Sequence, residues 1–160
     1  MNTGQFLYLT QARSDLRAFG LLADADVCHR IHYLQMMTEK LAKAYFWRRG
    51  HPPKKRHNYF VKFIRSVGSR GDVGKVIGFQ PGVFWKAYTD GMLPIALLVE
   101  RMAPSEAADG PNAEYPWPHD APTAAPATYR FPAWDVIAAP RGQRFLDLLR
   151  RLLDHFEQYE

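Results

Sequence analysis

"VCHRIHYLQMMTEKLAKAYFWRRG", residues 27–50, is the stretch of the chain that says most about its fold. Six of its residues recur at alternating intervals of four and three, which indicates one continuous stripe along a helix. The stripe consists of Val27, Ile31, Leu34, Thr38, Leu41 and Tyr45. We expect a helix over residues 27–49 that stops at Gly50, because glycine tolerates the positive φ of a helix C-terminus. A long helix with such a seam is typical of an antiparallel bundle.

Helical patterns also occur on both sides of this stretch. They cover residues 10–22 with Thr10 as cap, a region starting near His57 or Asn58, residues 83–102, and residues 141–158. Asp24 or Asp26 is the expected N-cap of the long helix. Gly91 and Pro94 are expected to divide the 83–102 region into two pieces. The glycines of residues 68–82 predict a flexible connection.

Residues 104–140 contain eight prolines, which excludes a regular helix or a central strand. The segment is nevertheless rich in aromatic side chains, which argues against disorder. These are Tyr115, Trp117, Tyr129, Phe131 and Trp134. The predicted fold is therefore all-α: an up-and-down bundle of four to five helices in a single domain of residues 1–160. A long, ordered, extended proline-rich segment lies along the bundle before the last helix.

The composition limits the classes of protein. A chain of 160 residues is the usual size of one domain, and 47% hydrophobic residues can fill its core. No run of about 18 apolar residues predicts a membrane span, and the N-terminus has no signal-peptide pattern. The single cysteine, Cys28, excludes an intramolecular disulfide and a cysteine metal cluster. We expect a cytoplasmic protein without a membrane partner.

The formal net charge of +5 is unevenly distributed. Between Leu41 and Gly71 there is no Asp or Glu, yet this stretch carries nine basic residues. They are Lys43, Arg48, Arg49, Lys54, Lys55, Arg56, Lys62, Arg65 and Arg70. Such segregation predicts one positive region that attracts nucleic acid, an acidic partner or a phosphate-bearing ligand, without choosing among them.

Order and spacing of several motifs resemble the HEPN superfamily of small helical bundles. "ARSDLRAFGLL" is similar to the family's first helix, with an Asp-Leu pair ahead of small and aliphatic residues. The long helix carries the family's Gln, then Glu-Lys, then Lys-Ala pattern, followed by a proline turn and a His. These residues are Gln35, Glu39, Lys40, Lys43, Ala44, Gly50, Pro52, Pro53 and His57. Tyr115-Pro116 matches part of the Arg-Tyr-Pro tripeptide of nucleotidyltransferase-associated members, but Glu114 replaces the Arg.

The resemblance implies an all-α bundle that often forms a homodimer. Members include RNA-cleaving toxins and defence proteins, partners of minimal nucleotidyltransferases, and binding modules without catalysis. Catalytic members use an Arg followed, after four to six residues, by a His. Here Arg150 and His155 have four residues between them, but they lie about 140° apart around an ideal helix. Arg151 and His155 share a face but break the family spacing, and the polar residue common after the Arg is missing. The alternative for all three is a solvated helix face or a dimer rim.

The turn after the long helix is the strongest candidate for an anion-binding or nucleic-acid-binding site. Its candidate residues are Arg48, Arg49, Lys54, Lys55, Arg56 and His57. Lysines and arginines can hold phosphates, while Trp47, Tyr59 or Phe60 could stack on bases. The structural alternative is a solvated loop, with Arg48 and Arg49 offsetting the helix dipole.

Other motifs carry less chemistry. His29 and His32 have a metal-binding spacing, but nothing nearby completes a ligand set, so we expect no metal. We expect Cys28 to be a small core residue. "VGSRGDVGK" lacks the Lys-Ser/Thr ending of a P-loop, and no cofactor is expected.

We therefore expect a HEPN-like module, non-catalytic or weakly catalytic, that binds nucleic acid, a nucleotide or a protein through a basic edge between the second and third helices. A toxin–antitoxin or defence system would suit it, with RNA or an acidic nucleotidyltransferase-like antitoxin as partner of a homodimer. One alternative is a dimeric, metal-independent ribonuclease; another is a structural partner of a nucleotidyltransferase.

Overall fold

The computed structural model describes residues 1–47, 51–54, 56–79, 83–118 and 124–160. Within these ranges the chain is helical and has no β-strand, and one isolated antiparallel bridge joins Trp117 and Ala124. The predicted all-α class is confirmed. The α-helices in these ranges are α1 (Thr3–Leu21), α2 (Val27–Phe46), α3 (Phe60–Gly68), α4 (Gly71–Val76), α5 (Val83–Glu100), α6 (Pro132–Ala138), α7 (Pro140–Asp154) and α8 (Phe156–Tyr159).

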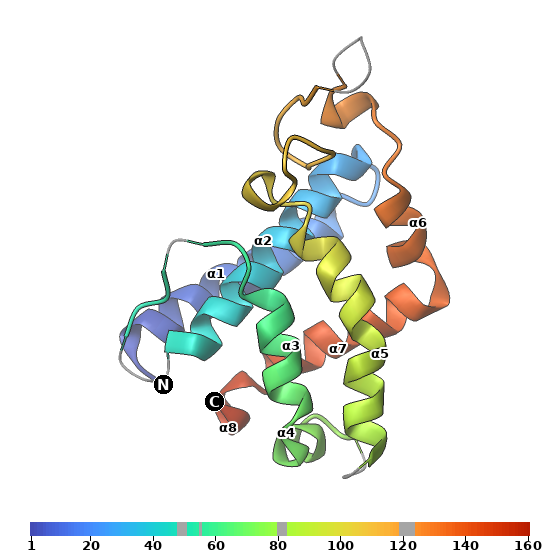
Figure 1. Cartoon of the computed structure of the whole chain (residues 1–160). Coiled ribbons are helices and arrows are strands. Elements are labelled where there is room, and N and C mark those ends of the chain that lie inside the picture. The colour runs from blue at the N-terminus through green and yellow to red at the C-terminus, as the bar shows by residue number, and fades with distance from the viewer. Residues whose placement is uncertain (48–50, 55, 80–82, 119–123) are drawn as a thin grey trace.

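Two pairs of neighbouring helices organise the molecule. α1 and α2 lie side by side as a helical hairpin, and α3 and α5 form a second antiparallel pair (Figure 1). α7 runs behind α3 and α5 (Figure 1) and contacts α1, α5 and α6. Nowhere in the described residues is a helix both long and apolar enough to cross a membrane.

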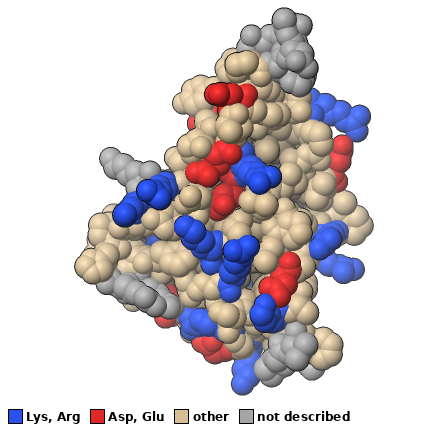
Figure 2. Space-filling model, in the orientation of Figure 1, with Lys and Arg blue, Asp and Glu red and all other residues tan. Residues whose placement is uncertain are grey.

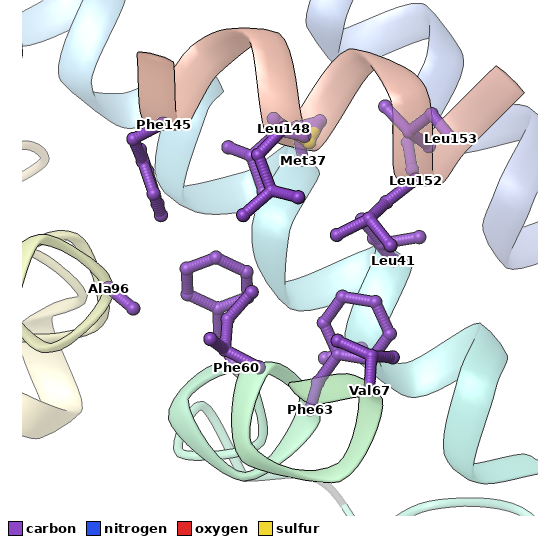
Figure 3. Close-up of a cluster of buried hydrophobic side chains, with 14 of the residues drawn as sticks. Met37, Leu41, Phe60, Phe63, Val67, Ala96, Phe145, Leu148, Leu152 and Leu153 are labelled. Carbon is purple, nitrogen blue, oxygen red and sulfur yellow. The ribbon is translucent and has the colours of Figure 1, made fainter. Parts of the chain in front are cut away.

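The main core lies where α7 faces α2 and α3. Figure 3 shows Phe145 and Leu148 of α7 pointing towards Phe60 of α3, with Met37 and Leu41 of α2 beside them. All five side chains are fully or almost fully buried. Phe60 and Phe145 meet edge to face, with ring centroids 6.0 Å apart, a geometry that adds to the energy of burial. Leu34, Leu41 and Tyr45 of the stripe predicted for the long helix lie in this core, whereas Val27 and Ile31 pack in a second, smaller cluster.

The first helix begins earlier than expected. α1 starts at Thr3, not at Thr10, because Asn2 and Gln5 form a capping box. The Asn2 side chain accepts a hydrogen bond from the Gln5 amide (2.9 Å), and the Gln5 side chain accepts one from the Asn2 amide (2.8 Å). α2 begins at Val27 as expected, with Asp26 at the N-cap position but without a side-chain cap bond. The expected stop at Gly50 lies outside the described residues.

Three expectations for the middle of the chain were wrong. α3 begins at Phe60, two to three residues later than expected. The connection of residues 68–82 contains the short helix α4, in which Gly74 packs so closely on Trp85 that a Cβ would lie 2.8 Å from the ring. α5 is continuous through Pro94. Pro94 is exposed while its neighbours Ile95 and Ala96 are buried, so packing of the inner face compensates for the missing hydrogen bond.

The proline-rich segment is ordered in its described part, as expected, but it is not free of helix. Short 3-10 turns occupy Pro104–Glu106 and Pro126–Thr128, and α6 was not expected. Pro132 and Pro140 stand at the first turns of α6 and α7, where a missing amide hydrogen is harmless.

The aromatic residues of this segment form a second, smaller core against the start of α2. Trp117, Phe131 and Met102 pack there with Cys28 and Ile31. The extended segment therefore lies on the bundle, as its aromatic content predicted. The last expected helix is divided: α7 ends at Asp154, and α8 follows after His155.

Candidate nucleic-acid interface

The buried carboxylate of Glu39 in α2 contacts His57 of the basic turn that follows this helix. Glu39 is 5% exposed, and its oxygens face three donors. His57 Nδ1 lies 2.6 Å from Glu39 Oε2, and Gln35 Nε2 donates to the same oxygen at 3.1 Å. Lys43 Nζ donates to Oε1. Burial by itself raises the pKa of Glu39, but the hydrogen bonds from Lys43 and His57 outweigh it, so the pKa lies below its ordinary value of 4.5. Glu39 is therefore ionised at neutral pH.

A second buried ion pair joins α1 to α2. Lys40 Nζ lies 2.5 Å from Asp15 Oδ2, and Gln11 Nε2 donates to Asp15 Oδ1 at 3.0 Å. Asp15 is 3% exposed. The polar residues of the motifs that resemble HEPN proteins thus form hydrogen bonds and ion pairs within the protein. Those that take part in the two networks are Asp15, Gln35, Glu39, Lys40 and Lys43.

Because of these networks, Lys43 cannot contact an external anion, and His57 can do so only with the part of its ring that Glu39 does not hold. Lys43 is buried against Glu39. The His57 side chain remains 40% exposed, so one edge still borders solvent while Nδ1 is held inside. Arg70, at the other end of the basic stretch, pairs with Asp72 at 2.5 Å. Arg48, Arg49 and Lys55 lie outside the described residues.

The basic residues of α3 line a groove between α3 and α5. This α3–α5 groove has a volume of about 460 Å³. Its walls are Asn58, Val61, Lys62, Arg65, Leu97, Glu100, Arg101 and Glu106. Figure 2 shows Lys and Arg side chains gathering over α3 and the end of α5 on this face, with acidic side chains above them. Two cations of α3 and one that directly follows α5 therefore line one hollow.

These three cations are available to a ligand. Lys62, Arg65 and Arg101 are exposed, and within the described part of the chain none of them forms an ion pair. Lys62 Nζ lies 5.8 Å above the ring of Tyr59, and the Tyr59 hydroxyl accepts a hydrogen bond from the Lys54 amide at 3.0 Å. Tyr59 thus connects the turn with the groove.

The turn that precedes α3 carries two further cations. The side chains of Lys54 and Arg56 are exposed and have no ion pair among the described residues. Together with the three cations of the groove they form what we call the basic face: Lys54, Arg56, Lys62, Arg65 and Arg101.

Glu100 lies at the floor of the groove and differs from Glu39 in its electrostatics. It is 8% exposed, and its Oε2 accepts a hydrogen bond from the Val61 amide at 3.0 Å, in the first turn of α3. Burial raises the pKa of Glu100 above its ordinary value of 4.5, and the amides of Val61 and Phe60 oppose this only in part. A helix N-terminus favours the negative charge, but the lack of solvent disfavours it more.

The three residues proposed from the HEPN catalytic pattern lie at the end of α7. Arg151 Nε lies 2.9 Å from Asp147 Oδ2, and its Nη1 donates to the carbonyl of Ile77 at 3.2 Å. Arg151 therefore ties α7 to the end of α4. Arg150 is exposed, and His155 is partly buried at the break between α7 and α8. All three lie outside the basic face.

The sequence did not point to the part of the groove that α5 supplies. Glu100 and Arg101 belong to the stretch "IALLVERM", whose apolar composition indicated the buried part of a helix and no ligand site. Glu106 comes from the proline-rich segment, which carried no predicted site. The only local signal was a pair of charged residues, Glu100 and Arg101, at the end of an apolar stretch. Their position opposite Lys62 and Arg65 depends on how α3 and α5 pack against each other.

The histidines near the start of α2 do not form a metal site in the described structure. His29 is exposed, and His32 Nδ1 lies 3.5 Å from Glu114 Oε1. Nowhere in the described ranges do three His, Cys, Asp or Glu side chains converge in a way that could hold a metal ion. Cys28 is 3% exposed within the second core, and burial raises its pKa, so it occupies the structural place expected for it.

Comparisons of the chain with known protein families, with curated proteins and with solved structures found no match.

Proposed function

We propose that the chain is a HEPN-like, non-catalytic module that binds nucleic acid, single-stranded RNA in particular, through its basic face. The observation that carries the proposal is the convergence of Lys62, Arg65 and Arg101 on one groove, with no ion pair to neutralise them in the described structure. Cations of this kind gain most from phosphate, because binding releases counterions from the nucleic acid. The interface differs from the predicted edge of the second and third helices by including α5.

A single strand fits the groove better than a duplex because of its size and its aromatic border. A hollow of about 460 Å³ can accept part of one phosphodiester chain, and Tyr59, whose ring centroid lies 5.8 Å from Lys62 Nζ, is the neighbouring aromatic residue. The ribonuclease alternative has no such support: Arg151 is held by Asp147 and the Ile77 carbonyl. It therefore enters only as an outcome of the test.

The proposal includes a cytoplasmic homodimer, as in many proteins of the family that the sequence resembles. Its support is apolar surface on α1, where Phe6 is 52% and Leu7 is 61% exposed. Leu7 also borders a hollow with Tyr8 and Trp47. Exposed apolar side chains that border a hollow are typical of interaction surfaces. This surface belongs to α1, whereas Lys62, Arg65 and Arg101 line the α3–α5 groove.

The experiment is a binding titration of the full chain with a fluorescein-labelled, unstructured single-stranded RNA, read by anisotropy. The test variant carries Lys62→Ala, Arg65→Ala and Arg101→Ala together. We expect its affinity to fall by about 100-fold, because three charge-assisted contacts are lost. The matched control carries Arg17→Ala, Lys75→Ala and Arg144→Ala, three exposed cations on α1, α4 and α7. It has the same net charge but should change affinity by less than about threefold.

Equal loss in both triple variants would show that net charge alone drives binding, against the proposal. Absence of RNA binding, together with saturable binding of polyglutamate, would assign the basic face to an acidic protein partner. Gel analysis of the same RNA after incubation tests the alternative activity. Cleavage that disappears in His155→Ala would identify a ribonuclease and contradict the non-catalytic proposal.

A further inference from the structure

An apolar pocket opens next to the α3–α5 groove. It has a volume of about 530 Å³, which is in the range of small-molecule sites. Its walls come from the end of α5, the loop after it, and the start of α6. The apolar part includes Leu98, Met102, Tyr129, Phe131 and Ala133. The second core supports this wall, because Phe131 and Met102 are packed in it.

The pocket and the groove share two charged residues. Arg101 and Glu106 line both hollows, so they stand where the two meet. Within the described residues neither side chain takes part in an ion pair. A ligand that fills the pocket would therefore have its polar end beside Arg101, facing the groove.

The balance of charge around this junction favours an anion. Lys62, Arg65 and Arg101 contribute three positive charges, and Glu106 and the buried Glu100 contribute two negative charges. The carboxylate of Glu100 accepts the Val61 amide hydrogen; burial raises its pKa, while that hydrogen bond and the charge of Lys62 oppose the rise. An anionic group beside Arg101 would be attracted by Lys62 and Arg65 of the adjoining groove.

The loop that contributes to the pocket wall has an unusual backbone. Ala108 and Asp109 both have positive φ values, 46° and 62°, which are rare for residues other than glycine. Ala108 forms part of the pocket wall. Backbone conformations of this kind are common in segments that shape a ligand site.

We infer that the pocket binds an amphiphilic anion, with an unbranched aliphatic chain among the apolar side chains and the anionic head group on Arg101. A nucleobase fits less well. Its amide and carbonyl edges need hydrogen-bond partners, and the charged side chains of the pocket, Arg101 and Glu106, stand at its mouth. The site goes beyond the proposed function, but Arg101 belongs to both, so a bound head group would compete with RNA phosphate.

The test is isothermal titration calorimetry of the full chain with octanoate, octyl phosphate, 1-octanol and acetate. Saturable binding of octanoate or octyl phosphate at one site per chain supports the inference, and the tighter of the two identifies the head group. Acetate, which lacks the chain, and octanol, which lacks the charge, should each bind at least about tenfold more weakly. Absence of saturable binding by both amphiphilic anions overturns the inference. Adenosine monophosphate that binds more tightly than either of them, and displaces them, also overturns it.

Two variants separate this site from the proposed RNA interface. Ala107→Phe places a ring at the pocket wall and should abolish octanoate binding while leaving RNA affinity unchanged. Its control is Ala127→Phe, an exposed alanine of the proline-rich segment that does not line the pocket. Arg101→Gln should weaken both ligands. If Ala107→Phe binds octanoate as tightly as the wild type, the pocket is not the site, whatever the RNA result; circular dichroism confirms that each variant is folded.

Discussion

His57 Nδ1 lies 2.6 Å from Glu39 Oε2, so the turn that follows α2 is held against a carboxylate that is buried within that helix. The contact places the exposed cations Lys54 and Arg56 next to the start of α3. It also separates the roles of the charges in this part of the chain. Lys43 and His57 stabilise the fold, and Lys62, Arg65 and Arg101 remain for a ligand.

Glu39→Gln should destabilise the protein by about 3–5 kcal/mol at pH 7, because it leaves the buried Lys43 without its counter-ion. The effect should depend on pH. The pKa of Glu39 is lower in the folded state than its ordinary value of 4.5, so its contribution is present above about pH 4.5 and is lost as the pH falls through the folded pKa. Urea denaturation of both proteins from pH 7 to pH 3 measures this.

The control is Glu157→Gln, whose exposed side chain lies 3.9 Å from Arg13. It should change stability by less than about 1 kcal/mol. A loss in Glu39→Gln as small as that of the control would mean that the network does not stabilise the turn.

Glu100→Gln should have the opposite effect and stabilise the protein, on the order of 1 kcal/mol at pH 7. The pKa of Glu100 is raised in the folded state, so its ionisation begins to cost folding free energy as the pH rises above about 4.5, and the cost is complete above the folded pKa. A glutamine oxygen can still accept the Val61 amide hydrogen. The gain should disappear at low pH, where the wild-type carboxyl is protonated. Thermal unfolding at pH 7 and pH 3.5 checks the sign, and a gain that grows at low pH would contradict it.

Gly142 lies in a closely packed site, whereas Gly20 lies at an open one, so alanine substitutions at the two should have opposite effects on stability. Gly142 lies in the first turn of α7, against the end of α6, and a Cβ there would collide with the carbonyl oxygens of Val136 and Ile137. Gly142→Ala should therefore destabilise the protein by about 1–3 kcal/mol. Gly20, near the end of α1, has no heavy atom within 4 Å of the place that a Cβ would occupy, so Gly20→Ala should stabilise it by about 0.5–1 kcal/mol. Chemical denaturation of both variants measures the change in the free energy of unfolding. Equal changes in the two variants would show that α6 and α7 pack less tightly at Gly142 than described.

Cys28 should react slowly with thiol reagents. Its side chain is 3% exposed in the second core, and burial raises its pKa, so little thiolate forms and the reagent cannot reach it. We expect modification by Ellman's reagent to be at least about 100-fold slower in the native chain than in guanidinium chloride. A native rate close to the denatured one would mean that the proline-rich segment opens readily from the start of α2.

The regular parts of the fold were predictable because their apolar periodicity is local. The stripe of Val27, Ile31 and Leu34 set the start of α2 without knowledge of any partner helix. The helix boundaries that were predicted wrongly depend on contacts between side chains, which an apolar pattern does not reveal. Asn2 and Gln5 start α1 through reciprocal hydrogen bonds.

The errors in the middle of the chain have a related cause. Composition alone suggested a break at Pro94, but the inner face of α5 holds the helix together.

The candidate site was predictable only in part for the same reason. The absence of acidic residues between Leu41 and Gly71 indicated a basic region. It did not indicate that Lys43 lies inside, because the partner Glu39 belongs to the previous turn of the helix. Arg101 is 36 residues from Arg65 in the chain, and only the pairing of α3 with α5 places them in one groove.

The salt dependence of RNA binding tests the central proposal most directly. The affinity for a single-stranded RNA is measured by anisotropy at salt concentrations from about 50 to 200 mM, for the wild type and for the triple variant at Lys62, Arg65 and Arg101. Each phosphate contact on a single strand contributes a slope of about −0.7 to the logarithmic plot. We expect a wild-type slope of about −2 or steeper, and a slope shallower by about 2 in the variant. A wild-type slope near zero, or the same slope in both proteins, would contradict the proposal.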